Sequence, residues 1–273
     1  MKRPRYDSFL ELCKNGSSED VAEVITRWIT IDQLGRFLIE AIRLRYPLKV
    51  LKILLDAGAD VNLADEDGNS PLQLLFLSDE RMAEKEWEEW PKSIYEGTDL
   101  LAPGEQTAAA VQLFLDAGAD LNRRDQYGNT PLMGAAGNSD AQSVALLLKL
   151  GADVNARNNH GDTPLLKATT SPWIYAQNLI PLLIESGADI NERNNHGDTP
   201  LLSAIRSSSC PQTVSLLIKT GAEVNAYNAD GDAPLSKAKA CNDSQVISLL
   251  IEAGAIAQDT NDGNLVIFKP HDD

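Results

Sequence analysis

The fold is determined by a ten-residue stretch, RNNHGDTPLL, which occupies residues 157–166 and recurs without a change at residues 193–202, 36 residues later. An offset of this size lies within the range that is typical of stacked supersecondary units. Within the stretch, Asn158 and Gly161 suit the first and fourth positions of a type I turn. Thr163-Pro164 then predicts a helix start, because the Thr hydroxyl can accept from a backbone N–H and Pro has a suitable φ.

The same pattern returns elsewhere in the chain with a few substitutions. The turn Gly and the following Pro-Leu are found again in residues 65–72, 125–132 and 228–235. A second signature precedes each turn: a Leu-rich segment ends at Gly-Ala-Asp/Glu-x-Asn. We expect its Gly to take the left-handed conformation that ends a helix. Such helix-ending glycines occupy positions 58, 118, 151, 187, 221 and 254.

After the first interval, these glycines are 33 to 36 residues apart. With these motifs the chain resembles ankyrin-repeat proteins, whose unit of ~33 residues has a turn, two helices and a T-P-L-H-x-A signature. The resemblance implies an all-α repeat fold, an ankyrin solenoid of stacked helix-turn-helix units with β-hairpin fingers. The His of the signature is missing, so its hydrogen bonds are not expected; its place is taken by Gln73, Met133, Leu166, Leu202 and Ser236.

We expect residues 1–273 to form a single ankyrin-repeat domain, because a repeat stack grows without a second core. Its predicted parts are an N-terminal cap at 8–31, repeats at 32–258, and a C-terminal cap and tail at 259–273. The first of these repeats is weaker, with turn chemistry at residues 32–35.

Two segments exceed the repeat length. The interval from Gly58 to Gly118 is 60 residues, 27 more than a 33-residue repeat. This excess predicts an insertion at residues 79–107, with a helix at 79–90 and a loop around 102–105. A smaller excess of three residues, at 169–175, predicts a longer loop between two helices.

The composition is acidic and excludes several classes of function. The chain has 24 Lys and Arg against 40 Asp and Glu, a formal net charge of −16, so the phosphates of nucleic acid would be repelled. The three cysteines share no metal-ligand spacing, and we find no catalytic constellation or phosphate-binding loop in the sequence. We therefore expect no cofactor, no metal and no enzymatic activity. Without a secretory signal or a long apolar run, we expect a cytoplasmic protein that does not contact a membrane.

Stacking places equivalent residues of adjacent repeats side by side, about 10 Å apart. The residue after the turn Gly is acidic in three successive repeats, at Asp162, Asp198 and Asp232. This row is either an acidic binding edge or a set of carboxylates that the following helix N-terminus favours.

The residue before the turn Gly forms another row, at the finger tips, with Tyr127, His160, His196 and Asp230. A metal bridge between the two His residues lacks an obvious third ligand, so we assign the row to protein binding.

Four aromatic residues lie in the two segments that exceed the repeat and are further candidates, namely Trp87, Trp90, Trp173 and Tyr175. They either contact a partner or pack on their own repeat.

The favoured hypothesis is a non-enzymatic protein-binding module that uses its concave face and fingers as a scaffold, adaptor or inhibitor. Its acidity would attract a basic protein partner, and an immunity protein of a toxin is the version to test first. We expect the free protein to be a monomer. The alternative is an effector or enzyme subunit that recruits a substrate or host protein, and turnover by the purified chain would distinguish it.

Overall fold

The structure is a computed structural model that describes a large part of the chain, namely residues 12, 20–21, 23–25, 29–44, 46–76, 103–138, 140–170, 173–207 and 210–256. At residues 31–32, 103–106 and 173–175 it describes the backbone alone. The chain divides into two compact units, Met1–Gln126 and Tyr127–Asp273. Both predicted caps fall mostly or wholly outside the described residues. The caps and the single-domain organisation therefore stay predictions.

The first unit contains two helix pairs among its described residues. Helix α3 (Ile31–Arg43) packs against α4 (Leu48–Asp56), and α5 (Pro71–Leu74) against α7 (Pro103–Asp116). The first helices, α3 and α5, also contact each other, as do the second helices, α4 and α7. Most of the predicted insertion, including its helix at 79–90, lies outside the described residues.

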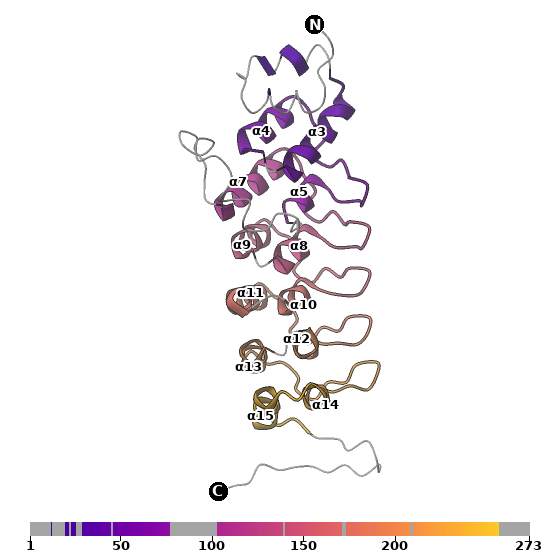
Figure 1. Ribbon diagram of the computed structural model, residues 1–273, viewed down its shortest axis with the longest axis vertical. Helices are drawn as coiled ribbons and strands as arrows, with labels where there is room; N and C mark the ends of the chain where they lie inside the picture. Colours follow the sequence, from indigo (N-terminus) through magenta and orange to yellow (C-terminus); the bar gives the residue numbers. More distant parts are fainter. Residues whose placement is uncertain are drawn as a thin grey trace. The chain divides into compact units, whose positions relative to one another are not determined.

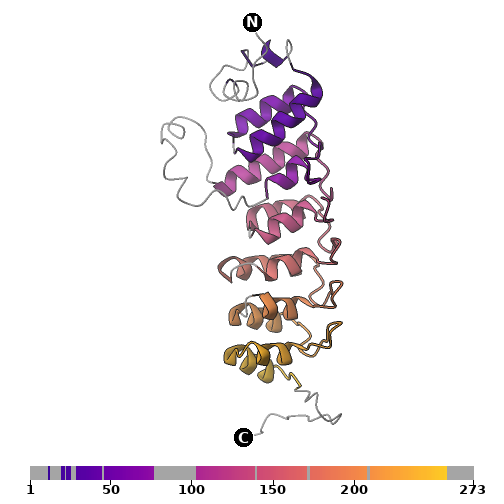
Figure 2. The ribbon, with the colours of Figure 1, turned by 45° about the vertical axis from the view of Figure 1, so that its right-hand side comes forward.

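Among its described residues, the second unit repeats the same pairing four times. Its pairs are α8 (Pro131–Gly137) with α9 (Ala141–Lys149), α10 (Pro164–Thr169) with α11 (Trp173–Glu185), α12 (Pro200–Ser207) with α13 (Pro211–Lys219), and α14 (Pro234–Ala240) with α15 (Ser244–Glu252). The first helices form one layer and the second helices another (Figure 1). A loop, here called a finger, leads into each first helix beyond the layers (Figure 2). The expected all-α repeat fold is confirmed.

The first helices begin as the Thr-Pro motif predicts. The Thr163 hydroxyl accepts a hydrogen bond from the backbone N–H of Leu166 at 3.3 Å, with Pro164 at the first helical position. In α5 the residue in place of the signature His is Gln73. Its side chain accepts from the Ser70 N–H at 2.8 Å, while the Ser70 hydroxyl accepts from the Gln73 N–H, so the two residues form a capping box.

The core lies between the two layers. The Leu that follows each Pro is at most 2% exposed in the second unit, at Leu132, Leu165, Leu201 and Leu235. The second helices contribute equally buried residues such as Leu147 and Leu217. Burying such a side chain contributes roughly 1.5–3 kcal/mol, so each repeat is held mainly by these contacts.

The Asn of the Gly-Ala-Asp/Glu-x-Asn signature joins one repeat to the next. The Asn155 side chain donates to the Gly187 carbonyl at 2.9 Å and accepts from the Asp189 N–H at 3.0 Å. Gly187 itself has a φ of 95°, so the predicted left-handed helix end is confirmed. In the first unit, Asn62 makes the same two bonds to Gly118 and Asp120.

The fingers differ from the expected β-hairpins, because the described residues contain no β-strand. Each finger has the predicted tight turn: the Gly161 N–H donates to the Asn158 carbonyl at 2.9 Å. The Asn158 side chain accepts from the N–H groups of His160 and Asp162 at 2.9 Å each. These local bonds compete with a strand ladder, so the finger remains a loop.

Two segments predicted as turn or loop are helical. Residues 32–35 lie in the first turn of α3, where Thr30 is the N-cap and its N–H donates to the Gln33 side chain at 3.2 Å. Residues 103–105 begin α7, because Pro suits the first position of a helix.

The extra residues at 169–175 do not lengthen the loop between α10 and α11. They lengthen α11 to 13 residues, where α9, α13 and α15 have 9 each. Three to four residues make one helical turn, so the insertion adds a turn and keeps the buried face of the helix in register.

Candidate protein-binding surface

The finger tips of the second unit form a continuous row. Tyr127, His160, His196 and Asp230 occupy equivalent places and are all exposed, Tyr127 by 55%. Their backbones are joined from one finger to the next. The Tyr127 carbonyl accepts from the Asn159 N–H at 2.9 Å, the His160 carbonyl from the Asn195 N–H at 2.9 Å, and the His196 carbonyl from the Ala229 N–H at 2.8 Å. The structure therefore brings these four predicted site residues together, and we call them the tip row.

The Gly after each of the first three tips, Gly128, Gly161 and Gly197, lets the next finger approach closely. Gly161 has a φ of 76°, and a Cβ there would lie 2.8 Å from the Asn195 nitrogen, closer than side-chain atoms approach a backbone. The side chains of His160, His196 and Asp230 make no hydrogen bond or ion pair within the described part of the chain. The backbone of the row is thus fixed while these side chains are available.

The carboxylates of the predicted acidic row hold neighbouring fingers together. Asp162 accepts from the Asn194 side chain at 3.0 Å and lies 3.2 Å from the Lys167 Nζ. Burial would raise the pKa of the Asp162 carboxyl. The Asn194 hydrogen bond and the Lys167 charge outweigh burial and hold this pKa below its usual value.

Asp198 is engaged in the same way and is more buried. It accepts from the Asn228 side chain at 2.8 Å and pairs with Arg206 at 2.7 Å, with 8% of its side chain exposed. Asp232 is looser, 3.9 Å from the Lys237 Nζ and with 40% of its side chain exposed. Hydrogen bonds and ion pairs within the protein therefore explain why residues 162 and 198 are acidic.

Of the four aromatic candidates, the two with a described backbone do not lie at the tip row. Trp87 and Trp90 lie outside the described residues. Trp173 and Tyr175 belong to the first turn of α11, and their side chains are not described. Because α10 runs away from its finger and α11 returns toward the next one, this turn lies at the far end of the helix pair (Figure 2).

A second acidic row, which the sequence reasoning did not select, lies where each second helix passes into a finger. It consists of Asp153, Asp189 and Glu223, all exposed. The Asp153 and Asp189 carboxylates accept from backbone N–H groups two residues later, at 3.0 and 2.9 Å. The sequence feature that could have identified this row is the Gly-Ala-Asp/Glu signature, in which the acidic residue follows a buried Ala. We call these three residues the finger-base acids.

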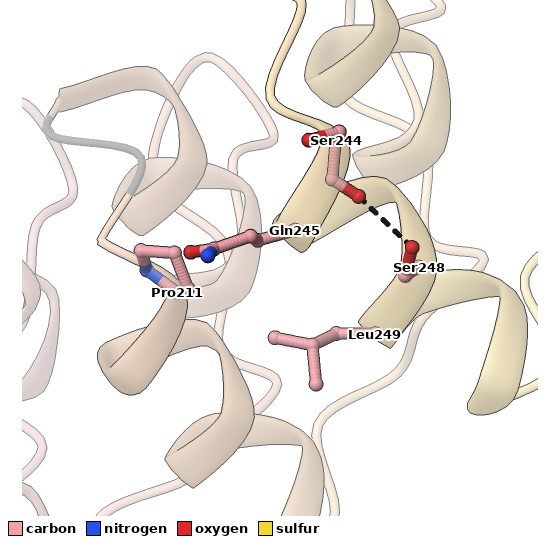
Figure 3. A pocket seen from close by; sticks show the side chains of 5 residues that line it. All are labelled: Pro211, Ser244, Gln245, Ser248 and Leu249. Carbon is pink, nitrogen blue, oxygen red and sulfur yellow. Dashed lines mark hydrogen bonds between the residues drawn. The ribbon is translucent and has the colours of Figure 1, made fainter.

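The described residues offer little for small-molecule chemistry. A shallow, open hollow of about 430 Å³ between α13 and α15 is lined by Pro211, Ser244, Gln245, Ser248 and Leu249 (Figure 3). None of these five side chains is ionisable, and Ser248 donates to the Ser244 carbonyl at 3.0 Å. Within the described ranges, no three His, Cys, Asp or Glu side chains are grouped to hold a metal ion, and no helix is long and apolar enough to cross a bilayer.

The repeat geometry agrees with comparison to known families. The family model for ankyrin repeats (3 copies) matches residues 101–194 and 173–264, together more than half of the chain. The chain belongs to the ankyrin-repeat family. Ankyrin repeats are protein-binding modules, and the tip row of this ankyrin protein is exposed. A search of the curated proteins finds no match to the chain.

Proposed function

We propose that this ankyrin-repeat protein is a non-enzymatic, acidic module that binds a basic protein through its tip row and finger-base acids. The observation that carries the proposal is the tip row, in which hydrogen bonds from finger to finger fix the backbone beneath exposed side chains. A surface that is ordered before binding loses less conformational entropy when the partner arrives. Such a module would act as an inhibitor, for example the immunity protein of a toxin.

The charge of the surface supports a basic partner. The chain carries a formal net charge of −16. The finger-base acids are exposed, and so is Asp230 in the tip row. Exposed charges of this kind speed the approach of an oppositely charged protein, most strongly at low salt. Asp162, Asp198 and Asp232 belong to the same proposed surface. We expect the paired Asp162 and Asp198 to position the fingers more than to attract the partner.

Trp87, Trp90, Trp173 and Tyr175 stay in the proposal as a separate contact region, because aromatic side chains often anchor interfaces. For Trp173, at the start of α11, we expect replacement by Ala to raise the dissociation rate of the partner and to leave the salt dependence of association unchanged. The tip-row variant below leaves this region intact and so separates the two contributions.

The proposal is tested by capture of a basic partner at low salt, followed by mass spectrometry. The informative variant combines Tyr127→Ala, His160→Ala and His196→Ala, which leaves the formal net charge unchanged. The control combines Asn138→Ala, Ser207→Ala and Cys241→Ala, at exposed positions where the first helices end, far from the fingers. We expect the tip variant to lose the partner by about tenfold or more in affinity and the control to keep it.

If both variants capture the partner equally well, the partner is bound by overall charge alone. The tip row then has no role in binding. If the partner is a toxin with a measurable activity, an equimolar amount of the ankyrin protein should abolish that activity, and the tip variant should not.

A further inference from the structure

The outer surface of the second helices in the second unit carries no charge over most of its area. The four helices end at equivalent residues, Lys149, Glu185, Lys219 and Glu252. The positions three, four, seven and eight residues before these ends share one helix face and are all at least partly exposed. These sixteen positions, four on each of four helices, hold Ala, Gln, Asn, Ser, Pro and Leu, and no Asp, Glu, Lys or Arg. We call them the neutral face.

A neutral exposed face is unusual in this chain. Charged residues make up 23% of the sequence, and about 25–35% of the surface residues are charged in a protein designed to be soluble. The centres of protein interfaces are depleted in charge, because burying an unpaired charge is costly. The neutral face shares this lack of charge with the centres of protein interfaces.

The four helix-end residues form a row whose charges alternate in sign. All four are exposed, and none makes an ion pair within the described part of the chain. Lys149 and Lys219 suit the negative end of a helix dipole, but Glu185 and Glu252 oppose it. The local structure therefore does not explain why the second and fourth positions are acidic.

We propose that the neutral face pairs with a second copy of this chain about a two-fold axis that runs parallel to the second helices, between α11 and α13. This axis reverses the order of the helices, so Lys149 meets Glu252 of the second copy and Glu185 meets Lys219 of the second copy. Every member of the row then faces an opposite charge. A two-fold interface must be self-complementary in this way, since the same patch serves both sides.

The size of the face fits the proposal. Its helices lie side by side (Figure 1), are about 14–20 Å long and are spaced roughly 10 Å apart, giving about 600–800 Å². A standard interface buries about 800 Å² on each partner. The hollow in Figure 3 lies on this face, so α9 and α11 of the second copy would cover it.

The occupant follows from charge. Two chains of net charge −16 repel each other over most of their surfaces, and the neutral face with its alternating row lets two copies meet without like charges in contact. This arrangement is an alternative to the monomer expected from the sequence, which stays a prediction. It does not use the tip row, so it stands whether or not the proposed partner exists.

The test is the self-association of the full chain, measured by sedimentation velocity and light scattering from about 1 to about 100 μM. The wild type should dimerise within this range. Glu185→Lys or Lys219→Glu should each raise the dimer dissociation constant about tenfold or more, because each creates two like-charge contacts in the dimer. The double variant Glu185→Lys/Lys219→Glu should recover dimerisation to within about threefold of the wild type.

A second pair of variants tests the face itself. Ser215→Arg, on α13 near the proposed axis, should abolish the dimer. Ser207→Arg, at the exposed end of α12 in the other layer, should leave the dimer unchanged. Circular dichroism melts confirm that each variant is folded. A wild type that stays monomeric, a dimer insensitive to Ser215→Arg, or a folded double variant that fails to recover would each overturn the proposal.

Discussion

Gly161 and Gly187 both have a positive φ, of 76° and 95°, but they differ in their surroundings. A Cβ on Gly187 would meet no atom within 4 Å, whereas a Cβ on Gly161 would lie 2.8 Å from the Asn195 nitrogen. We expect Gly187→Ala to cost about 1 kcal/mol of stability through backbone strain alone. Gly161→Ala should cost about 2–4 kcal/mol, because the next finger must also move. Urea unfolding of both variants measures the difference, and equal losses would contradict the close approach of the fingers.

The N-terminus of α13 lacks a side-chain cap at Cys210, three residues before Thr213. Within the described part of the chain, the Thr213 hydroxyl is buried without a hydrogen-bond partner. The Cys210 side chain makes no capping hydrogen bond to α13, and its thiol donates to the Gln212 side chain at 3.1 Å instead. At the equivalent place before α9, Asp140 accepts from the Ser143 N–H at 3.1 Å and from its hydroxyl at 2.6 Å.

Introducing that acid into α13 should therefore stabilise the protein. We expect Cys210→Asp to raise the free energy of unfolding by about 1 kcal/mol, because it caps the helix and gives the Thr213 hydroxyl an acceptor. Cys210→Ala is the control for loss of the thiol. If the melting temperature of Cys210→Asp is no higher than that of Cys210→Ala, the cap geometry of α13 is not the one described.

At the scale of the finger, Asp162 links stability to pH. The pKa of Asp162 is lower in the folded protein than in the unfolded chain. The ionised carboxylate therefore stabilises the fold fully above about pH 4–5, and this stabilisation is lost as the pH falls through the folded pKa. We expect Asp162→Asn to cost about 1 kcal/mol at pH 7, and this difference from the wild type to shrink below about pH 4. Urea midpoints between pH 7 and pH 3 measure it, with Asp230→Asn at an exposed tip as the control. A difference that is constant down to pH 3 would show that the charge of Asp162 does not matter.

Most helices could be predicted from the sequence because their start and end signals are local. Thr163-Pro164 begins a helix and Gly187 ends one through bonds within a few residues. The prediction for residues 32–35 was wrong because an Asp and a Gly three residues apart suit both a turn and the first turn of a helix. The extra residues at 169–175 were misread because a count of residues does not distinguish a longer loop from one more helical turn.

The candidate site was predicted in part for a similar reason. The tip row follows from equivalence between repeats, which the sequence shows directly. The pairing of Asp198 with Arg206 joins a finger to the far end of a first helix, and the contact depends on the packed geometry. The neutral face is defined by the absence of charged residues and not by a motif. It can be recognised only once the helix ends are known, because its positions are counted from them.

At the scale of the whole molecule, the net charge of −16 should make stability depend on salt in a particular direction. Raising NaCl from about 10 to about 200 mM shortens the screening length from about 30 Å to below 10 Å and weakens the repulsion among excess acids. We expect the melting temperature to rise by a few degrees, because the repulsion outweighs the few exposed ion pairs. Calorimetry at both salt concentrations measures the effect. A fall would mean that exposed ion pairs such as Arg157 with Glu192 dominate.

The amide-to-acid contact between fingers has a consequence for how such a chain can lengthen. The finger of Asn194 and Asp198 contains both halves of the contact: its amide donates to Asp162 in the preceding finger, and its carboxylate accepts from Asn228 in the following one. A duplicated copy inserted between two fingers would therefore find a compatible neighbour on each side without any compensating substitution. The unchanged ten residues at 157–166 and 193–202 are what such a recent duplication would leave. Each added copy would extend the tip row by one side chain that is free to diverge.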